Sequence, residues 1–284
     1  MKFQRIIEAV YGQPLDITVG GFESVDAVIR LHLAAGNRLG SGAVQDGFEV
    51  GKTDFFGTPL PDMLQVDEDS GLALIGICGP LLQHASLIEK SCGACSYQDI
   101  ERALDEAMAE PSARTLLLNF DSPGGQHCGS LELAQKIARI AMAGKKQIFA
   151  FTEGTMASAA YCLAAGCNGI FSTKTASVGC IGSLIAFMDF SEAFAKQGVK
   201  AVVFASGKYK GTGLEGTSLT QEQADYLMGL VNTAAGVFKA HVREFRQVNS
   251  DSMQGQIFFG EHCERLGLVD GVVRGLDEVK SLLC

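Results

Sequence analysis

The sequence predicts an α/β domain with a mainly parallel sheet flanked by helices. Three apolar runs of strand length, residues 72–78, 115–120 and 147–152, are separated by segments with helical periodicity at residues 96–110 and 130–143. Strands that alternate with helices favour βαβ units, in which consecutive strands run parallel. Functional residues in such sheets gather on the loops that follow the carboxyl ends of the strands.

Composition restricts the class of protein further. Of 284 residues, 47% are hydrophobic, which is enough to bury a sizeable core, and a net charge of -9 gives no attraction for nucleic acid or anionic membranes. Nine scattered cysteines favour a reducing, cytoplasmic setting. The first residues lack the apolar segment of a signal peptide, and no apolar window reaches membrane-spanning length. We therefore expect a soluble protein without a membrane span.

The amino-terminal region differs from the rest of the chain. Residues 3–11 and 25–33 have short helical patterns, the second with Ser24 as a possible N-cap. Residues 36–62 are rich in glycine and aperiodic, which is typical of a linker. We expect an arm and linker over residues 1–62 and a compact domain over residues 63–284.

The elements of the compact domain follow in order. The strand at residues 72–78 precedes a helix that Ser96 and Asp99 open as a capping box and Pro111 ends. The strand at residues 115–120 leads to the helix at residues 130–143, which stops at Gly144.

A second series begins after the strand at residues 147–152. A small-residue helix over residues 157–165, a strand at 169–171 and a strand at 200–205 precede a long helix that begins at a Thr220/Gln223 capping box and runs to about residue 246. One apolar stripe of that long helix favours core or subunit interface over a cofactor site: Ala224, Leu227, Val231, Ala234 and Phe238.

The loop after the strand at residues 115–120 reads Asp-Ser-Pro-Gly-Gly and ends at Gly125. Without Cβ atoms, Gly124 and Gly125 let backbone N–H groups approach a substrate oxyanion closely. An ordinary turn is the alternative, and turn chemistry alone favours it.

The loop after the strand at residues 147–152 places Ser158 at the start of the small-residue helix. A serine there suits a nucleophile because the next backbone N–H is free, although serine also commonly caps helices. No histidine lies between Ser158 and the long helix, so a Ser-His-Asp triad lacks an obvious base in that region. Lys208 and Lys210 can supply the base, because burial disfavours the charged ammonium and can bring the pKa of a lysine near neutrality. A solvated loop lysine is the alternative, and it is the usual case for any single lysine.

Two cysteine patterns are given ordinary interpretations. Cys92 and Cys95 form a CxxC without a second ligand pair at zinc-finger spacing, so we expect no metal. His127 and Cys128 are sequence neighbours, and neighbouring side chains on a helix or strand do not face each other.

Taken together, five ordered motifs resemble the signal peptide peptidase A (protease IV) family. They are the segment ending at Gly125, Ala-Ser158-Ala-Ala-Tyr, Ala-Ser177-Val-Gly-Cys-Ile-Gly, Ser-Gly-Lys-Tyr-Lys210, and residues 258–270. The resemblance covers about residues 70–280. Within the family the chain is most similar to the phage prohead (head maturation) proteases of the lambda minor capsid protein C type.

The resemblance implies a ClpP/crotonase-like fold and a Ser/Lys dyad. Ser158 aligns with the nucleophile, Lys210 with the general base, and Ser177 with the serine that orients the lysine. It also implies that Ala159 and Gly125, or alternatively Gly124, supply the oxyanion N–H groups.

Two positions depart from the family pattern. Ala159-Ala160 stands where the family usually has Gly-Gly, which narrows the approach to Ser158, and Gly211 stands where an acidic residue commonly follows the lysine.

The function expected from these residues is that of a soluble serine endopeptidase that needs no cofactor. The resemblance implies a homo-oligomer in the host cytoplasm, or within the prohead, that cleaves capsid, portal or scaffold proteins during phage head maturation. Two alternatives remain open: a crotonase-type acyl-CoA enzyme, and a catalytically silent capsid- or scaffold-binding protein on the same fold.

Overall fold

The computed structural model describes residues 10–34, 62–85, 89–90 and 92–284. The expected helix at residues 3–11, apart from its last two residues, and almost all of the linker at residues 36–62 lie outside these ranges. The helix expected at residues 25–33 is present within the longer α2 (Val19–Ala34).

A six-stranded sheet with the order β13-β10-β8-β6-β3-β2 forms the centre of the domain. Five of its strands run parallel, and only β2 pairs antiparallel, with β3. The α/β prediction is therefore confirmed. The strands are β2 (Leu64–Asp67), β3 (Leu72–Cys78), β6 (Thr115–Asp121), β8 (Gln147–Thr152), β10 (Gly169–Thr173) and β13 (Gly271–Val273).

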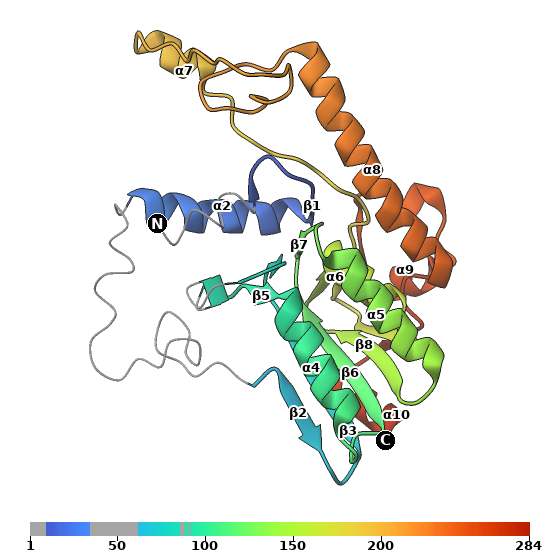
Figure 1. The fold of residues 1–284 in the computed structure, drawn as a ribbon. Helices are drawn as coiled ribbons and strands as arrows, with labels where there is room; N and C mark the ends of the chain where they lie inside the picture. Colours follow the sequence, from blue (N-terminus) through green and yellow to red (C-terminus); the bar gives the residue numbers. More distant parts are fainter. Residues whose placement is uncertain (1–9, 35–61, 86–88, 91) are drawn as a thin grey trace, which may run out of the picture.

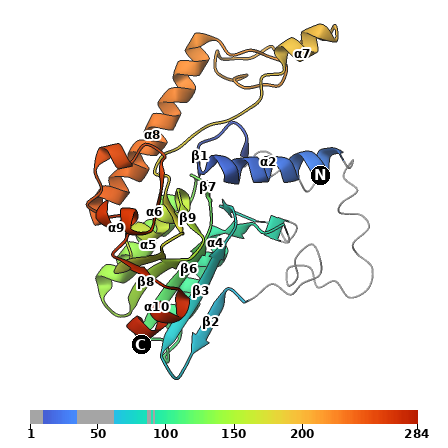
Figure 2. The same cartoon turned by 180° about the vertical axis from the view of Figure 1, so that it is seen from behind.

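Helices cover both faces of this sheet because side chains alternate along each strand. Leu116 and Leu118 of β6 join the main core beneath α4, α5 and α6, whereas Leu117 packs in a second cluster with Val279 of α10. Figure 1 shows α4 and α5 on one face, and Figure 2 shows α10 on the opposite one. The helices are α4 (Tyr97–Ala109), α5 (Ser130–Ala143), α6 (Ala159–Ala165), α9 (Gly260–Arg265) and α10 (Leu276–Leu283).

Two smaller sheets lie at the carboxyl ends of the central strands. In the first, β1 pairs antiparallel with β7, and β7 and β5 both pair parallel with β4. In the second, β11 lies between β9 and β12. The strands are β1 (Leu15–Ile17), β4 (Leu81–Leu82), β5 (Cys95–Ser96), β7 (Gly124–Gln126), β9 (Thr155–Ala157), β11 (Ser177–Gly179) and β12 (Ile257–Phe259).

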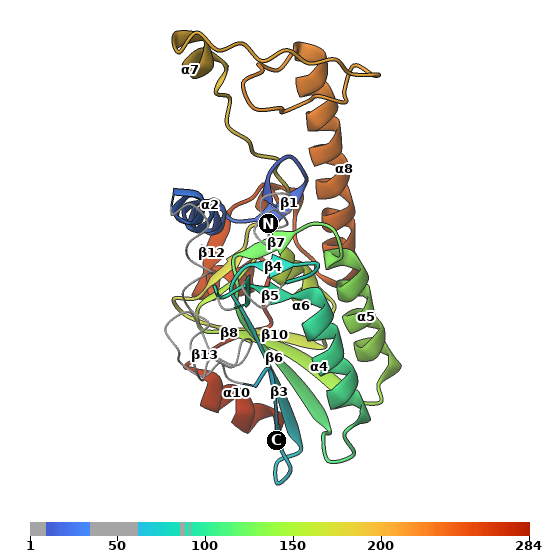
Figure 3. The same cartoon turned by 60° about the vertical axis from the view of Figure 1, so that its left-hand side comes forward.

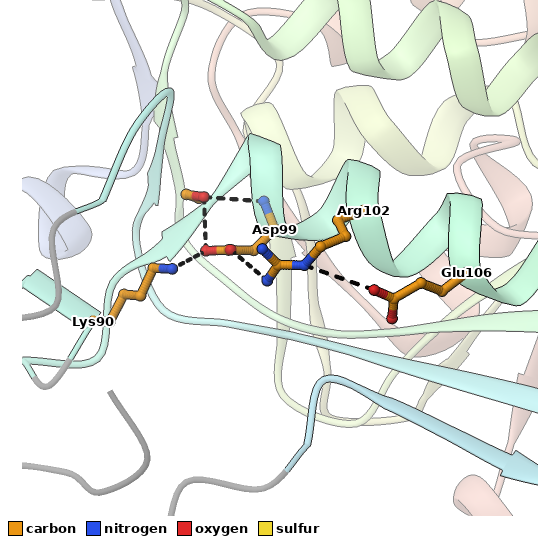
Figure 4. A network of polar contacts seen from close by, with 5 residues as sticks. Lys90, Asp99, Arg102 and Glu106 are labelled. Carbon is orange, nitrogen blue, oxygen red and sulfur yellow. Dashed lines mark hydrogen bonds and ion pairs between the residues drawn. The ribbon is translucent and has the colours of Figure 1, made fainter. Parts of the chain in front are cut away.

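A polar network holds the amino terminus of α4 (Figure 4). Ser96 caps the helix by accepting from the Asp99 backbone N–H, and its hydroxyl donates to the Asp99 carboxylate. Lys90 and Arg102 pair with that carboxylate, the latter at 2.8 Å. Burial alone would raise the pKa of Asp99, but the hydrogen bonds from Lys90 and Ser96 outweigh it and hold the pKa below its ordinary value.

The long helix α8 (Gln221–Phe245) begins at the predicted capping box, in which the Thr220 side chain accepts from the Gln223 backbone and Gln223 bonds back to Thr220. Only its second half packs against the body, through Ala234, Phe238, His241 and Val242. The first half projects away from the domain, as Figures 1 and 3 show.

The projecting half of α8 carries residues 187–220, which include α7 (Ser191–Lys196). From here on, the arm means this segment and not the amino-terminal arm expected at residues 1–62. The prediction of a strand at residues 200–205 is wrong, because these residues pair with no other strand and have no regular secondary structure. Their apolar side chains are largely exposed, to 96% for Phe204. Apolar character alone therefore did not define a strand here. Within the described ranges, no helix is long and apolar enough to cross a membrane.

The α4 network predicts a measurable stability difference. We expect Asp99→Asn to lower the free energy of unfolding by about 1–2 kcal/mol at pH 7. The substitution removes the charged group that accepts from the Ser96 hydroxyl and pairs with Lys90 and Arg102. A carboxylate whose pKa is lowered by folding stabilises the fold above its unfolded pKa and loses that contribution as the pH falls through the folded value. The difference from wild type should therefore shrink below about pH 4.

Urea unfolding at pH 7 and at several acid pH values measures this difference. The control is Glu106→Gln, whose carboxylate is 3.9 Å from Arg102 and exposed, and which should change stability by less than about 0.5 kcal/mol. A pH-independent Asp99→Asn difference would contradict the electrostatic explanation.

Candidate active site

Two neighbouring turns build the candidate site. One follows β6 and leads into β7, and the other follows β8 and leads through β9 into α6. Backbone hydrogen bonds join them: the Ser122 N–H donates to the Thr155 carbonyl (2.7 Å), and the Ala157 N–H donates to the Ser122 carbonyl (3.2 Å). The parallel pairing of β6 with β8 thus fixes the Gly-Gly turn beside the serine turn, as the sequence predicted for loops at one sheet edge.

Gly124 lies directly against Ser158. A Cβ atom built on Gly124 would be 2.8 Å from the Ser158 Cβ, 2.9 Å from the Ala159 backbone N and 2.2 Å from the Asp16 carbonyl oxygen. Gly124 also has φ +96°, which side chains rarely tolerate. Only glycine therefore fits at this position.

Ser158 has the backbone of a residue held under strain. Its φ of 56° and ψ of -120° fall outside the regions that non-glycine residues normally occupy. Its hydroxyl makes no helix cap, so the ordinary interpretation as a capping serine does not hold. The Ser158 N–H donates to the Gly179 carbonyl (2.7 Å), and Oγ lies 3.5 Å from the Gly182 carbonyl oxygen. The side chain is 0% exposed.

The oxyanion candidates are placed differently from one another. Ala159 is the first residue of α6, where a backbone N–H has no partner within the helix. Gly124 lies beside that N–H, whereas Gly125 is paired in the sheet with Leu81 of β4 and Asp16 of β1. The Gly124 N–H itself donates to the Ser122 hydroxyl (3.3 Å). The Ala159 N–H, at the amino terminus of a helix and next to Ser158, is thus the backbone donor best placed for a developing oxyanion.

Ser177 and Lys210 are not brought to Ser158 within this chain. Ser177 is paired with Thr155 at the start of β11, two residues before Gly179, whose carbonyl Ser158 contacts. Lys210 is exposed on the arm, and its side chain makes no hydrogen bond or ion pair with another described residue. The structure therefore places the expected nucleophile and the expected base on different parts of the chain.

The arm loop around Lys210 is held against the amino-terminal end of α8. Lys208 pairs with Glu222, and its carbonyl accepts from the Gln223 side chain at 3.2 Å. Tyr209 stacks on Tyr226 with the ring centroids 4.6 Å apart. These contacts fix the loop to the first two turns of the helix, well away from α6 (Figure 1).

A buried polar cluster beside the serine was not predicted from the sequence. Asp16 is 0% exposed, its Oδ2 lies 2.8 Å from His127 Nδ1, and the Ser183 hydroxyl donates to its Oδ1. The hydrogen bond to Asp16 raises the pKa of His127 above its ordinary value, although burial opposes the shift. The position of His127, two residues after Gly125, was a usable signal, whereas no sequence signal pointed to Asp16.

Cysteines do not assemble a second site among the described residues. Cys180, close to Ser158, has a positive φ of 52°, and burial raises the pKa of its thiol. Cys92 is exposed while Cys95 is buried, with its pKa raised to about 12, mainly by burial. Across the ranges that the structure covers, no three cysteine, histidine or acidic side chains group as metal ligands would.

Comparison with known proteins connects this geometry to a family. A family model described as peptidase family S49 matches residues 141–282, half of the chain. That range includes Ser158, Ser177 and Lys210 but begins after the Gly-Gly turn.

Similar proteins include two from phages. The chain is 27% identical to the head-tail preconnector protein GP5 of Enterobacteria phage P21, over 75% of this chain and 43% of that protein. It is 26% identical to the capsid assembly protease C of Escherichia phage lambda, over 74% of this chain and 48% of that protein. The chain thus spans less than half the length of these relatives. A solved enoyl-CoA hydratase from Mycobacterium smegmatis aligns with a TM-score of 0.44 at 14% identity, covering 78% of this chain and 76% of that one.

The contact at Gly124 predicts a selective effect of adding one methyl group. We expect Gly124→Ala to destabilise the chain by at least about 2 kcal/mol and to abolish labelling of Ser158 by a fluorophosphonate, because the methyl group meets backbone and the Ser158 Cβ. Gly76→Ala is the matched control, since its Cβ would meet nothing within 4 Å. Urea unfolding and probe labelling measure both effects, and normal labelling of Gly124→Ala would refute the assigned geometry.

Proposed function

The chain belongs to peptidase family S49, and from this we propose that it is a serine endopeptidase with Ser158 as nucleophile. The observation that carries the proposal is the state of Ser158: its backbone is strained, its hydroxyl makes no capping hydrogen bond, and its side chain packs against Gly124. A structural serine gains nothing from that backbone strain, whereas a nucleophile that must be aimed at a carbonyl carbon does.

The proposed reaction follows the acyl-enzyme route. Ser158 Oγ attacks the scissile carbonyl carbon while the base takes its proton, and the oxyanion that forms accepts from the Ala159 N–H and from the Gly-Gly turn. The tetrahedral intermediate collapses, and the leaving amine takes the proton back from the base. Water then attacks the acyl group and releases it, so the route requires no cofactor.

We assign the base to Lys210, supplied by a neighbouring copy of the chain. Lys208 pairs with Glu222 and lies 4.8 Å from the Tyr209 ring, which leaves Lys210 as the lysine of this loop without such partners among the described residues. The first buried residue of α8 is Ala234, so roughly 20 Å of helix separates the arm from the body, at 1.5 Å per residue. The helix therefore holds Lys210 away from Ser158 of the same chain, and Lys210 can reach Ser158 of a neighbouring chain.

The exposed apolar residues of the arm support this homo-oligomer. Val199, Val202, Phe204 and Leu214 of the arm, and Met228 of the adjoining α8, are each at least half exposed. Several large apolar side chains exposed on one short segment favour a surface that another protein covers. In the assembly, Ser177 would be the group that orients the incoming lysine.

The proposed substrates are proteins of a phage head: capsid, portal or scaffold chains. Support comes from the names of the relatives, one a capsid assembly protease and the other a head-tail preconnector protein. The proposed setting is accordingly the host cytoplasm or the prohead.

Acylation and product analysis test the function directly. A fluorophosphonate should label the wild-type chain and not Ser158→Ala, and the purified chain should retain no CoA. Co-expression with the neighbouring structural proteins, followed by mass spectrometry, should show fragments that are missing with Ser158→Ala. Absence of both labelling and cleavage would reject the peptidase in favour of a silent binding protein.

The two arm lysines should differ in their effect on catalysis. We expect Lys210→Ala to reduce kcat/KM about a hundredfold or more, the usual effect of deleting a general base. Lys210→Arg should fail equally, since a guanidinium does not give up its proton near neutral pH. Lys208→Ala is the control and should keep most activity. A strong loss in Lys208→Ala with normal Lys210→Ala would refute the assignment.

Mixing two inactive variants tests whether the lysine comes from a neighbour. Ser158→Ala retains Lys210, and Lys210→Ala retains Ser158, so mixed oligomers would contain complete sites. We expect labelling of the Lys210→Ala subunits to recover to at least about a tenth of the wild-type rate after dissociation and reassembly. Each variant reassembled alone is the control. No recovery, despite proven mixing of subunits, would show that the dyad forms within one chain.

A further inference from the structure

The amino-terminal strand β1 is bound as an extended peptide would be. On one side Leu15–Ile17 pairs antiparallel with Gly124–Gln126. On the other side the Leu15 N–H donates to the Leu184 carbonyl and the Leu184 N–H donates to the Leu15 carbonyl, both at 2.9 Å. An added strand held through its backbone on both edges is a common mode of peptide recognition. We name this space the peptide groove, bounded by β7 and by Ser183–Leu184.

The register brings one carbonyl of β1 to the catalytic groups. The Thr18 N–H donates to the Pro123 carbonyl (2.9 Å), and the His127 N–H donates to the Pro14 carbonyl (3.4 Å). Hydrogen-bonded pairs recur every second residue in an antiparallel ladder, so Asp16 and Gly125 form the pair between them.

The Asp16 carbonyl oxygen therefore points at the Gly-Gly turn. It lies 2.2 Å from the point where a Gly124 Cβ would be, and that point is 2.8 Å from the Ser158 Cβ and 2.9 Å from the Ala159 N. For a substrate bound in the same register, the carbonyl at this position would be the one that faces Ser158. Asp16 would then correspond to the residue before the scissile bond, and Ile17 to the residue after it.

The Asp16 side chain shows what the groove accepts at that residue. A fully buried carboxylate is costly unless its oxygens are paired, and here His127 meets one oxygen and the Ser183 hydroxyl meets the other. His127 follows β7 and Ser183 precedes Leu184, so each side of the groove contributes one recognition group. Neither residue has a part in the acyl-enzyme route proposed above.

Two observations indicate that β1 can leave the groove. Ser158 is completely buried in this chain, although a nucleophile has to meet its substrate. An apolar cavity of about 140 Å³ also remains between β1, α2 and the body, lined among others by Leu15, Ile17, Val25 and Leu82. The Leu15 and Ile17 side chains of β1 are thus buried but incompletely packed.

We propose that residues 14–18 are a substrate-like occupant of the peptide groove, and that His127 and Ser183 select a carboxylate side chain, aspartate or glutamate, immediately before the scissile bond. The inference rests on the proposed peptidase function and adds to it a class of substrate and two specificity residues. The chain's own segment must move aside before a substrate of this class can bind.

A binding experiment tests the preference without catalysis. It uses the full chain with Ser158→Ala and Asp16→Ala, which removes the nucleophile and the anchor of the occupant. We expect a fluorescent peptide Pro-Leu-Asp-Ile-Thr to bind at least tenfold more tightly than Pro-Leu-Asn-Ile-Thr. Adding His127→Gln and Ser183→Ala should remove the difference. His262→Gln, an exposed histidine on α9, is the matched control and should keep it. Equal affinities, or no binding of either peptide to the folded protein, would overturn the proposal.

Hydrogen exchange of Ser158→Ala alone covers the case in which Asp16→Ala does not fold. The aspartate peptide should speed exchange of the Leu15 amide as it displaces β1, while the Leu184 amide stays protected by the incoming peptide. The asparagine peptide should need at least tenfold higher concentration. Unchanged Leu15 exchange at saturating aspartate peptide would overturn the proposal.

Cleavage of the same peptides by the chain with native Ser158 separates this inference from the peptidase function. Selective binding without any cleavage would reject the peptidase and leave the carboxylate-binding groove standing. Cleavage with equal kcat/KM for aspartate and asparagine peptides would keep the peptidase and reject the role of His127 and Ser183.

Discussion

The contact of Gly124 with Ser158 is the constraint around which the site is built. Each residue has a positive φ, and there is no room between them for even one methyl group. Such a contact persists only where the surrounding structure over-determines it. The parallel pairing of β6 with β8 and the backbone bonds from Ser122 provide that support, because they fix both turns from the sheet below. The sheet thereby holds the Ser158 side chain against the Gly-Gly turn, which is the geometry on which the proposed function rests.

The rest of the molecule divides into a part that supports this contact and a part that stays open to partners. α4, α5 and α6 cover one face of the central sheet and α10 covers the other, so apolar side chains on both faces are buried. The first half of α8 and the arm extend from it with apolar side chains exposed. Under the proposed function, such a chain carries the nucleophile Ser158 in its body and the base Lys210 on its arm, and a neighbouring subunit would supply the lysine.

The amino-terminal segment links these two aspects. By pairing with β7 and with Leu184, it fills the space next to Ser158 with the chain's own backbone. The same groups that bind a peptide then hold the site closed until a competitor replaces it. Because Asp16 is buried with specific partners, occupancy of the groove depends on side-chain chemistry as well as on backbone pairing.

The sequence by itself determined the elements whose patterns are local. The strands at residues 72–78 and 147–152, the helix at residues 130–143 and the Thr220/Gln223 cap are present as predicted, because apolar periodicity and capping chemistry act over a few residues. Ser158 and the Gly-Gly turn could also be singled out, since both follow predicted strands. Which of the two glycines lies against Ser158 could not be told from the sequence, and the choice of oxyanion donor between them stays a prediction.

Only the tertiary structure decided what depends on distant neighbours. It placed Gly124 rather than Gly125 against Ser158, and it brought Asp16 to His127 across 111 positions of sequence. It also left residues 200–205 without a strand partner, although their apolar run predicted one. Strand pairing and the burial of a carboxylate are settled by what lies opposite in space. The residue pattern of one segment does not show which distant segment will pair with it.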